Sequence, residues 1–345
     1  MCGLRKNAIP RLRNGKSKNN SSLIYLDTRT PFTQIENYLR SKSWLFAAER
    51  ILSVEKPGEG NMNVVLRIQT DQRTFVLKQS RPYVQKYREI AAPLDRIEVE
   101  HRFYQIVQDE NLEKHFPKIL GYDPNEFILL LEDLGQCEDM VSCYNKRTIA
   151  PKVLNQLLHT LNKIHQKKPP SDFPENLAMR QLNHQHIFVL PFLEENGFEL
   201  DKVQPGLETL AAPYKKDLAL KKTVGNLGEK YLSKGNTLLH GDYYPGSWMS
   251  KEAVIYIIDP EFSFVGFAEF DLGVMVAHLI MITMDCSYLE HIYNGYQGKA
   301  DKKLTAQIAG VEIMRRLIGL AQLPMQRSLD EKQLLLQSAK QMILS

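Results

Sequence analysis

The spacing of hydrophobic positions divides the chain into a strand-like first part and a helix-like second part. A short amphipathic helix is predicted from Pro31, with Ile35, Tyr38 and Leu39 at helical spacing. After it the period falls to two, and a further helical stretch follows over residues 94–107. The predicted strands cover residues 50–55, 63–69, 74–79, 118–122 and 127–131. Their order indicates a small antiparallel sheet accompanied by one helix.

Beyond about residue 137 the pattern becomes mostly helical. The helical stretches cover residues 150–167, 205–232, 271–297 and 303–320, and short strands are predicted at 237–239 and 254–258. A β-rich segment followed by a helical one predicts an α+β fold of two lobes, with the boundary near Glu132 to Gly135. The predicted units are a basic disordered tail (1–30), a nucleotide-binding lobe (31–135) and a helical lobe with the catalytic and substrate site (136–345). Ligands commonly bind in the cleft between two lobes.

Composition excludes several classes of protein. The 345 residues are 43% hydrophobic and 24% charged, as in ordinary globular proteins. The net charge of +4 comes from the first twenty residues, which hold six basic and no acidic residues and leave 38 basic against 40 acidic residues elsewhere. No basic surface for nucleic acid is therefore expected. The longest apolar run, Leu272 to Met284, is too short to span a bilayer and predicts a buried helix. We expect a cytoplasmic protein without a membrane partner.

Three acidic residues between positions 240 and 271 have the arrangement that phosphoryl transfer from ATP requires. Asp242 lies in a loop after a His-Gly pair, where a carboxylate can orient or accept the proton of a substrate hydroxyl. Asp259 and Glu261 follow the strand at 254–258. In an extended segment, residues two apart point to the same side, so both carboxylates can face one Mg²⁺ ion. The structural alternative is a set of capping acids in a salt-bridged loop.

Two neighbours of these acids have smaller predicted roles. Ser247 stands five residues after Asp242, where a weak oxygen ligand for a cation is useful. His240 is predicted to be a structural histidine that bonds backbone groups, and not a catalytic base.

The first lobe supplies candidate ATP-binding residues. The segment GEGNMN, which contains Asn61 and Asn63, lies between two strands and can approach phosphates closely, or it can simply form a turn. Lys78 ends the third strand; in a cleft it would contact phosphates, with Glu100 as its carboxylate partner and Glu98 as the alternative. Taken alone, Lys78 would be interpreted as a solvated lysine at the end of a strand. The apolar strand that ends at Leu134 can present free backbone groups to an adenine edge, or it is merely a strand end.

The order of these motifs resembles the aminoglycoside phosphotransferase and choline kinase superfamily, which has a protein-kinase-like fold. Within it, segments of the 5-methylthioribose kinases are similar in the same order, from about Glu55 to Ala321. The similar segments are GEGNMNVV, VLKQSRPYV, PLDRIEVE, LLEDL, HGDYYPGS, IDPEFSFVGFAEFDLG and MRRLIGLA. The DPEF segment with its following FD and the late Arg-Arg pair are the specific parts, since HGD alone identifies only the superfamily.

The resemblance assigns a role to each candidate. It implies that Asp242 faces a sugar hydroxyl, that Asp259 and Glu261 hold Mg²⁺, and that Arg315 and Arg316 reach into the sugar site. The residues expected to contact ATP are Asn61, Asn63, Lys78, Glu100, Glu132, Asp133 and Leu134, the last three through the backbone. Without the resemblance, the arginine pair reads as one surface and one packing residue.

The expected function is that of an ATP- and Mg²⁺-dependent kinase for a sugar hydroxyl, with 5-methylthioribose as the first acceptor to test. Aminoglycosides, homoserine, choline-like alcohols and other sugars stay open, because Tyr243-Tyr244-Pro245 replaces the family's Leu-His-Thr in a loop that lines the acceptor pocket. The chain is also shorter than its relatives between Asp271 and Met314. A nucleotide-binding pseudokinase module is the alternative from another class. The expected partners are ATP, a small-molecule acceptor and, as one option, a second copy in a homodimer.

Overall fold

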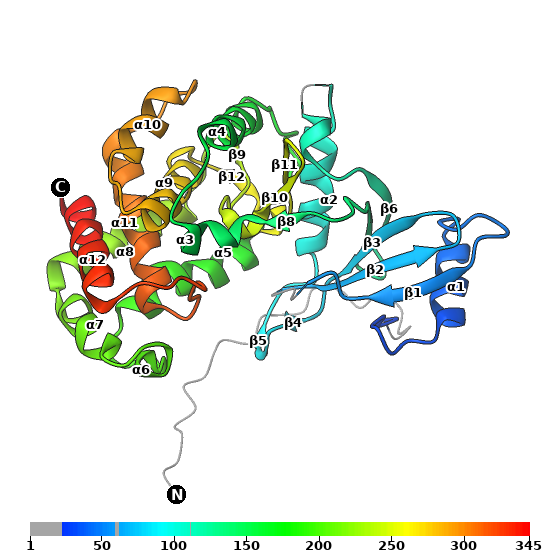
Figure 1. Cartoon of the computed structure of the whole chain (residues 1–345), viewed down its shortest axis with the longest axis horizontal. Helices are drawn as coiled ribbons and strands as arrows, with labels where there is room; N and C mark the ends of the chain where they lie inside the picture. The colour runs from blue at the N-terminus through cyan, green and yellow to red at the C-terminus, as the bar shows by residue number, and fades with distance from the viewer. Residues whose placement is uncertain (1–22, 59–61, 111) are drawn as a thin grey trace, which may run out of the picture.

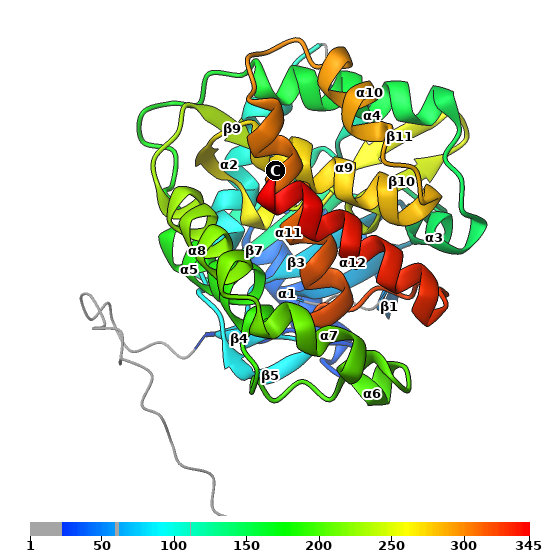
Figure 2. The ribbon, with the colours of Figure 1, turned by 90° about the vertical axis from the view of Figure 1, so that its left-hand side faces the viewer.

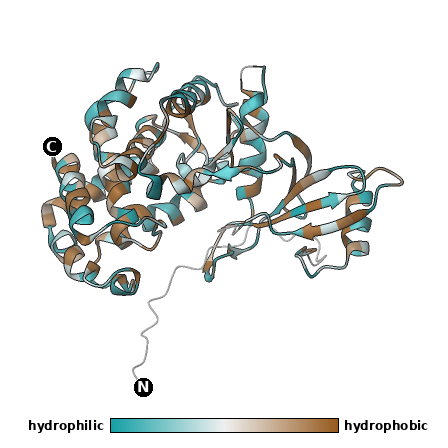
Figure 3. Ribbon diagram, viewed as in Figure 1, coloured by the Kyte–Doolittle hydropathy of each residue, from teal (hydrophilic) through white to brown (hydrophobic). Residues whose placement is uncertain are grey.

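The computed structural model describes residues 23–58, 62–110 and 112–345. A small β lobe and a larger, mostly helical lobe lie side by side, as the α+β prediction required (Figure 1). Both lobes show hydrophobic and hydrophilic stretches, and brown segments are frequent along the strands of the β lobe (Figure 3).

The β lobe is built on one antiparallel sheet with the strand order β1-β2-β3-β7-β6. Its strands are β1 (Ile51–Glu55), β2 (Val64–Thr70), β3 (Thr74–Gln79), β6 (Ile119–Asp123) and β7 (Ile128–Glu132). Helix α1 (Phe32–Ser41) buries Ile35, Tyr38 and Leu39 in the core of this lobe, as predicted. Strand β3 lies in the middle, and its register sets Lys78 opposite Val65 on one side and Leu129 on the other. Two hydrogen-bonded neighbours therefore fix the backbone of Lys78.

Helix α2 (Arg96–Val107) belongs by sequence to the first lobe, but its hydrophobic side packs elsewhere. Ile97, Phe103 and Tyr104 are buried in the core that continues through the helical lobe. This packing carries the polar side of α2 to the junction of the lobes. A small hairpin of β4 (Tyr83–Val84) and β5 (Tyr87–Ala91), which the sequence pattern did not predict, precedes α2.

The helical lobe contains most of the hydrophobic core. Its longer helices are α4 (Pro151–His165), α7 (Leu207–Lys216), α8 (Leu218–Leu232), α9 (Glu269–Thr283), α11 (Lys302–Ile318) and α12 (Leu329–Leu344). The shorter ones are α3 (Cys143–Lys146), α5 (Leu177–His184), α6 (Leu200–Val203), α10 (Tyr288–Gly295) and a π-helical turn at Gln185–Val189. Helix α9 is buried almost all round, which confirms the buried helix predicted there. Figure 2 shows α12 in front of α11, which also packs against α9.

Local capping explains where the predicted helical stretches divide. The stretch 205–232 forms two helices because Asp217 caps α8, accepting a hydrogen bond from the backbone N–H of Leu220. The stretch 271–297 ends its first helix at Met284, which adopts a left-handed backbone. Helix α12 was not predicted, although Ser328 and Glu331 form a capping box that the sequence S-x-x-E announces.

Short strands and turns support the loops of the helical lobe. One small sheet pairs β8 (Glu138–Asp139), β10 (Trp248–Lys251) and β11 (Val254–Ile257), and another pairs β9 (Thr237–Leu239) with β12 (Phe264–Gly266). Turns of 3-10 helix occupy Glu113–His115, Met140–Ser142, Leu190–Phe192, Pro245–Ser247 and Pro260–Phe262. The strands at 237–239 and 254–258 were predicted.

The tail predicted over residues 1–30 is too long. Residues 23–30 belong to the β lobe: Leu26 is fully buried, and its backbone N–H donates to Gln79 Oε1 while Arg81 donates to its carbonyl oxygen. A hydrophobic residue outside a periodic segment gave no signal of this packing. Among the described residues, no helix is long and apolar enough to cross a membrane.

Candidate active site

A cleft of about 470 Å³ lies where the two lobes meet. The predicted site residues that line it are Asn63, Lys78, Asp242, Ser247, Asp259, Glu261, Arg315 and Arg316. They come from the loop before β2, from β3, from the segments before β10 and after β11, and from α11. The fold therefore gathers residues from both lobes that are far apart in the sequence.

Lys78 joins the two lobes through a pair of carboxylates. Its Nζ lies 2.6 Å from Glu100 Oε1 on α2 and 2.6 Å from Asp259 Oδ1 in the helical lobe. Glu100 is fully buried, whereas about half of the Asp259 side chain is exposed to the cleft. Glu98, the alternative partner for Lys78, is exposed on α2. Glu100 is therefore the partner.

Burial and charge oppose each other in this group. Burial disfavours the ammonium of Lys78, but Asp259, Glu100 and Glu261 outweigh it and hold the pKa of Lys78 above its usual value. Burial also raises the pKa of Glu100, against the attraction of Lys78. The other oxygen of Glu100, Oε2, is buried and has no hydrogen-bond partner within the part of the chain that the structure describes. Lys78 is therefore a permanent cation at the edge of the cleft.

Glu261 is held by residues of the β lobe. Its Oε2 accepts from Asn63 Nδ2 at 3.1 Å and lies 3.2 Å from Arg96 Nε. Asn63 Oδ1 in turn accepts from Arg96 Nε and Ser80 Oγ. Burial raises the pKa of Glu261 to about 7, against the opposing charges of Arg96 and Lys78. The side-chain amide of Asn63, expected to contact phosphate, is thus already engaged with protein groups.

The expected extended backbone between Asp259 and Glu261 is wrong. Asp259 is left-handed, with φ 62° and ψ 48°, and residues 260–262 form a 3-10 turn. Proline at position 260 fixes φ there and favours such a turn over a strand. Both carboxylates nevertheless line the cleft, because the turn and not a β alternation directs them there.

The fit of this pair to a divalent cation can be judged from its oxygen atoms. Within the described ranges, no three His, Cys, Asp or Glu side chains cluster closely enough to enclose a metal ion. Mg²⁺, however, is usually held by one or two carboxylates together with substrate phosphates and water. Asp259 offers an exposed carboxylate and Glu261 a second one at the cleft surface. The donor set therefore fits a cation that arrives with a nucleotide.

Asp271 anchors the loop that carries Asp242. From the first turn of α9, its two oxygens accept the backbone N–H groups of His240 (2.7 Å) and Gly241 (2.9 Å). His165 Nε2 lies 3.2 Å from the same carboxylate. Gly241 has φ 86°, and a Cβ there would lie 2.2 Å from the carbonyl oxygen of Phe262. Only glycine fits this corner.

Asp242 faces the cleft with its backbone fixed on both sides. Its N–H points to His240 Nδ1 (3.4 Å), and its carbonyl oxygen accepts the hydroxyl of Ser247 (2.9 Å). His240 Nε2 bonds the carbonyl oxygen of Ile258, and burial lowers the pKa of His240. His240 is therefore the neutral structural histidine that was predicted. Ser247 braces the loop, which leaves its role as a weak cation ligand a prediction.

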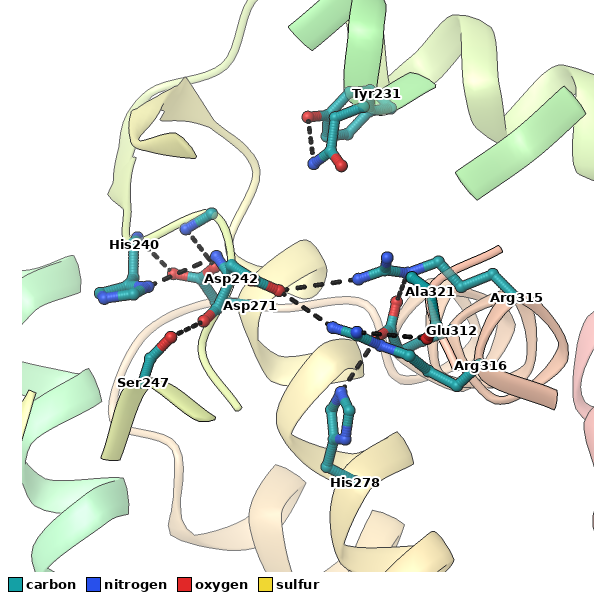
Figure 4. Close-up of polar contacts among 12 residues, drawn as sticks. Tyr231, His240, Asp242, Ser247, Asp271, His278, Glu312, Arg315, Arg316 and Ala321 are labelled. Atoms are coloured by element: carbon teal, nitrogen blue, oxygen red, sulfur yellow. Dashed lines mark hydrogen bonds and ion pairs between the residues drawn. The ribbon is translucent and has the colours of Figure 1, made fainter. Parts of the chain in front are cut away.

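Two arginines of α11 converge on Asp242 (Figure 4). Arg316 Nη2 and Arg315 Nη2 lie 3.3 and 3.6 Å from Asp242 Oδ1. Both arginines are buried, so the interpretation of one as a surface residue is wrong. Burial raises the pKa of Asp242 above its usual value although both guanidinium groups oppose this shift. The carboxylate thus combines cationic neighbours with an enhanced affinity for a proton.

The residues at the lobe boundary that were predicted to contact adenine lie apart from this cleft. Glu132, Asp133 and Leu134 are not among the residues that line it. The backbone N–H of Glu132 donates to Lys118, and Asp133 pairs with Arg67. Leu134 presents its carbonyl oxygen to Lys251 Nζ at 2.9 Å. The adenine contacts assigned to these residues stay predictions, as does the role of Asn61, which lies outside the described residues.

The loop expected to line the acceptor pocket does so only in part. Tyr243 is fully buried in the core and donates its hydroxyl to the carbonyl of Leu157, so its predicted place in the pocket is wrong. Tyr244 does line the cleft and lies under Arg316, with the guanidinium carbon 4.5 Å from the ring centre. The two adjacent side chains leave the loop on opposite sides, and only long-range packing decides which one is buried.

Sequence reasoning missed three residues that organise the site. Arg96 neutralises Glu261, Asp271 holds the Asp242 loop, and Glu312 pairs with both arginines of α11. A glutamate three and four positions before an arginine pair is a signal for helical ion pairs. The other two partners are separated from their targets by many residues; both lie in segments similar to the family, but no local pattern gave either of them a role.

Comparison with known proteins gives a consistent relationship. A model of the phosphotransferase enzyme family matches residues 53–307. The methylthioribose kinase of Pectobacterium atrosepticum is 27% identical over 259 residues, which cover 71% of this chain and 64% of that protein. The methylthioribose kinase of Exiguobacterium sibiricum is 28% identical over 246 residues, covering 66% and 61%. The chain thus spans less than two thirds of the length of these relatives.

Solved structures show the same fold. A choline kinase from Streptococcus pneumoniae aligns with a TM-score of 0.50 at 14% identity, covering 90% of this chain and 99% of that one. A spectinomycin phosphotransferase in its AMP-bound form aligns with a TM-score of 0.52 at 14% identity, covering 82% and 87%. The predicted protein-kinase-like architecture is confirmed at the level of the fold.

Proposed function

The chain belongs to the phosphotransferase enzyme family, and from that premise we propose that it is an ATP- and Mg²⁺-dependent kinase for a sugar hydroxyl. The proposed acceptor is 5-methylthioribose, which would yield methylthioribose 1-phosphate and ADP. The methylthioribose kinases among its relatives support this acceptor. The observation that carries the proposal is the Lys78 group with Glu100 and Asp259, set in the same cleft as Asp242.

The residues divide the chemistry between them. The acceptor oxygen forms a bond to the γ-phosphorus of ATP while the bond from that phosphorus to the bridging oxygen of ADP breaks. Asp242 orients the hydroxyl and takes its proton, for which its raised pKa is suited. Lys78 neutralises nucleotide phosphates, and Arg315 and Arg316 stabilise charge on the transferring group. Mg²⁺, held by Asp259 and Glu261, would neutralise the nucleotide phosphates when bound.

The acceptor side of the cleft argues against cationic substrates. Two buried guanidinium groups lie beside Asp242 and offset its negative charge. A polyhydroxylated, uncharged acceptor therefore suits this site better than an aminoglycoside or a choline-like alcohol. Homoserine and other sugars stay as alternative acceptors.

Transfer of labelled phosphate from ATP to a panel of these acceptors tests the proposal. We expect phosphorylation of 5-methylthioribose with a higher kcat/KM than any other acceptor, and its loss in Asp242→Asn. Phosphorylation of another acceptor alone would retain the kinase and refute the substrate. Nucleotide binding without transfer to any acceptor would instead support the pseudokinase alternative. The homodimer and the cytoplasmic location stay predictions.

A further inference from the structure

We infer that Glu312 is a positioning residue, which brings Arg315 and Arg316 together on Asp242. This inference rests on the proposed function in one respect, namely that Asp242 faces the acceptor. Glu312 lies on α11, one helical turn before the arginines, and is fully buried. It does not line the cleft, so it acts only through its neighbours.

Two adjacent residues of an α-helix do not normally point to the same place, so the convergence of the two arginines requires a group that holds their side chains. Adjacent helical positions point in directions about 100° apart. Arg315 and Arg316 nevertheless both reach Asp242 Oδ1. Glu312 supplies the anchor, because Oε1 accepts from Arg316 Nε at 2.8 Å and Oε2 accepts from Arg315 Nε (Figure 4). With both Nε groups held, the Nη2 atoms of both side chains are directed at Asp242.

The charge of Glu312 is stable in this position. Burial opposes its ionisation, but Arg315, Arg316 and a hydrogen bond from His278 outweigh burial and hold the pKa of Glu312 well below its usual value. Three buried charges thus form one group with Asp242 as the fourth. Replacing Glu312 would leave two guanidinium groups without their internal partner.

His278 on α9 and Tyr144 on α3 fix the orientation of Glu312. His278 Nε2 lies 2.9 Å from Glu312 Oε1, and Tyr144 Oη lies 2.5 Å from His278 Nδ1. Burial lowers the pKa of His278 to about 4, so the ring is neutral with one N–H. Because an ionised carboxylate only accepts, that N–H is on Nε2. Nδ1 then accepts the Tyr144 hydroxyl, which burial keeps protonated. The hydrogen bonds of the chain all run in one direction, toward Glu312.

On the cleft side, the ring of Tyr244 contacts both Arg316 and His278. The guanidinium carbon of Arg316 lies 4.5 Å from the ring centre of Tyr244, and that ring lies 5.0 Å from the His278 ring. Arg316 is therefore held at Nε by a carboxylate and across its plane by a ring. These contacts restrict the guanidinium to the position in which it meets Asp242.

Variants of His278 test this inference without removing any charged group. His278→Gln retains a side-chain N–H near the Nε2 position, whereas His278→Leu removes it. Thr305→Val is the matched control, because Thr305 is buried on α11, the helix of Glu312, and its hydroxyl donates to the carbonyl of Asp301 and, among the described residues, to no group of the Glu312 cluster. The first readout is hydrogen exchange of the Nε–H groups of Arg315 and Arg316 by NMR, assigned through Arg315→Lys and Arg316→Lys. It needs no acceptor.

We expect exchange in His278→Leu to accelerate at least about ten-fold, and exchange in His278→Gln and Thr305→Val to stay within about three-fold of wild type. In turnover assays, His278→Leu should lower kcat about 10- to 100-fold with an unchanged KM for ATP, and His278→Gln should restore it. Wild-type behaviour of His278→Leu, or equal losses in both His278 variants, would overturn the inference. If the wild type phosphorylates no acceptor, the proposed function fails, and the exchange data still decide the role of Glu312.

Discussion

Lys78 Nζ lies 2.6 Å from Asp259 Oδ1, although 181 positions separate the two residues in the chain. This contact joins the central strand of the β lobe to the turn after β11. With Glu100 on the other side, it places one cation between two carboxylates at the cleft.

Lys78→Met should destabilise the protein, because it leaves the fully buried Glu100 without a cation. We expect the free energy of unfolding to fall by about 3 kcal/mol or more in urea titrations. Adding Glu100→Gln should recover part of this loss. Adding Glu98→Gln, on the exposed side of the same helix, should recover none. Equal recovery by both second changes would exclude the assigned pairing.

Gly241→Ala should abolish turnover by displacing the loop that carries Asp242. The added methyl group would lie 2.2 Å from the Phe262 carbonyl oxygen, at a residue with φ 86°. A displacement of about 1 Å can cost about 100-fold in rate. Gly225→Ala is the control, since Gly225 is in α8 and no atom of the described residues lies within 4 Å of an added Cβ. It should raise stability by up to about 1 kcal/mol and leave kcat unchanged.

Asp271→Asn should loosen the same loop from the other side. The carboxylate accepts two backbone N–H groups, from His240 and Gly241, whereas an amide offers one oxygen and one N–H₂ group. One buried backbone donor is then left without an acceptor. We expect a loss of about 1–3 kcal/mol in the free energy of unfolding and a lower kcat. An unchanged urea midpoint would show that Asp271 does not hold the loop.

The stability of the protein should depend on pH through His278. Its pKa in the folded protein is about 4, against 6.5 for the ordinary group. The contribution of the neutral His278 to the free energy of unfolding is therefore complete above pH 6.5. As the pH falls toward 4, this contribution is lost and the free energy of unfolding decreases by about 3 kcal/mol. The neighbouring charges are Glu312, Arg315 and Arg316 on α11. Between pH 7 and 4, His278→Gln should lose about 3 kcal/mol less than wild type in urea titrations.

Asp259→Asn should uncouple Mg²⁺ from nucleotide binding. Asp259 contributes the exposed carboxylate of the proposed cation site. In calorimetric titrations, Mg²⁺ should increase the affinity of the wild-type protein for ATP. In Asp259→Asn this increase in affinity should be about 10- to 100-fold smaller. Because Asp259 also pairs with Lys78, the substitution can change the affinity for ATP without the metal, and a titration with metal-free ATP measures that change. An equal effect of Mg²⁺ on both proteins would contradict the assignment.

Local pattern was sufficient for the elements and for part of the site. The strands at 74–79 and 237–239 and the helix at Phe32–Ser41 follow from hydrophobic period alone. Asp242, the acid after His-Gly, and Lys78, the lysine at a strand end, were identified from the sequence as residues of two different lobes that share one cleft. Each of these features depends on spacing within about ten residues, which a sequence displays directly.

The contacts that make the site depended on tertiary structure. Arg96 with Glu261, and Asp271 with the Asp242 loop, join residues that no local pattern relates. Burial also reversed one expectation, because Tyr243 turned into the core. Both arginines of α11 line the cleft, as the resemblance implied, whereas local pattern alone had placed one of them at the surface. The sequence by itself determined the element types and the chemical groups available, because these depend on neighbouring residues. Apart from the pair of Lys78 and Glu100, which the sequence indicated, the partner of each buried charge was decided only by packing, since a buried polar group accepts whatever partner the fold brings within reach.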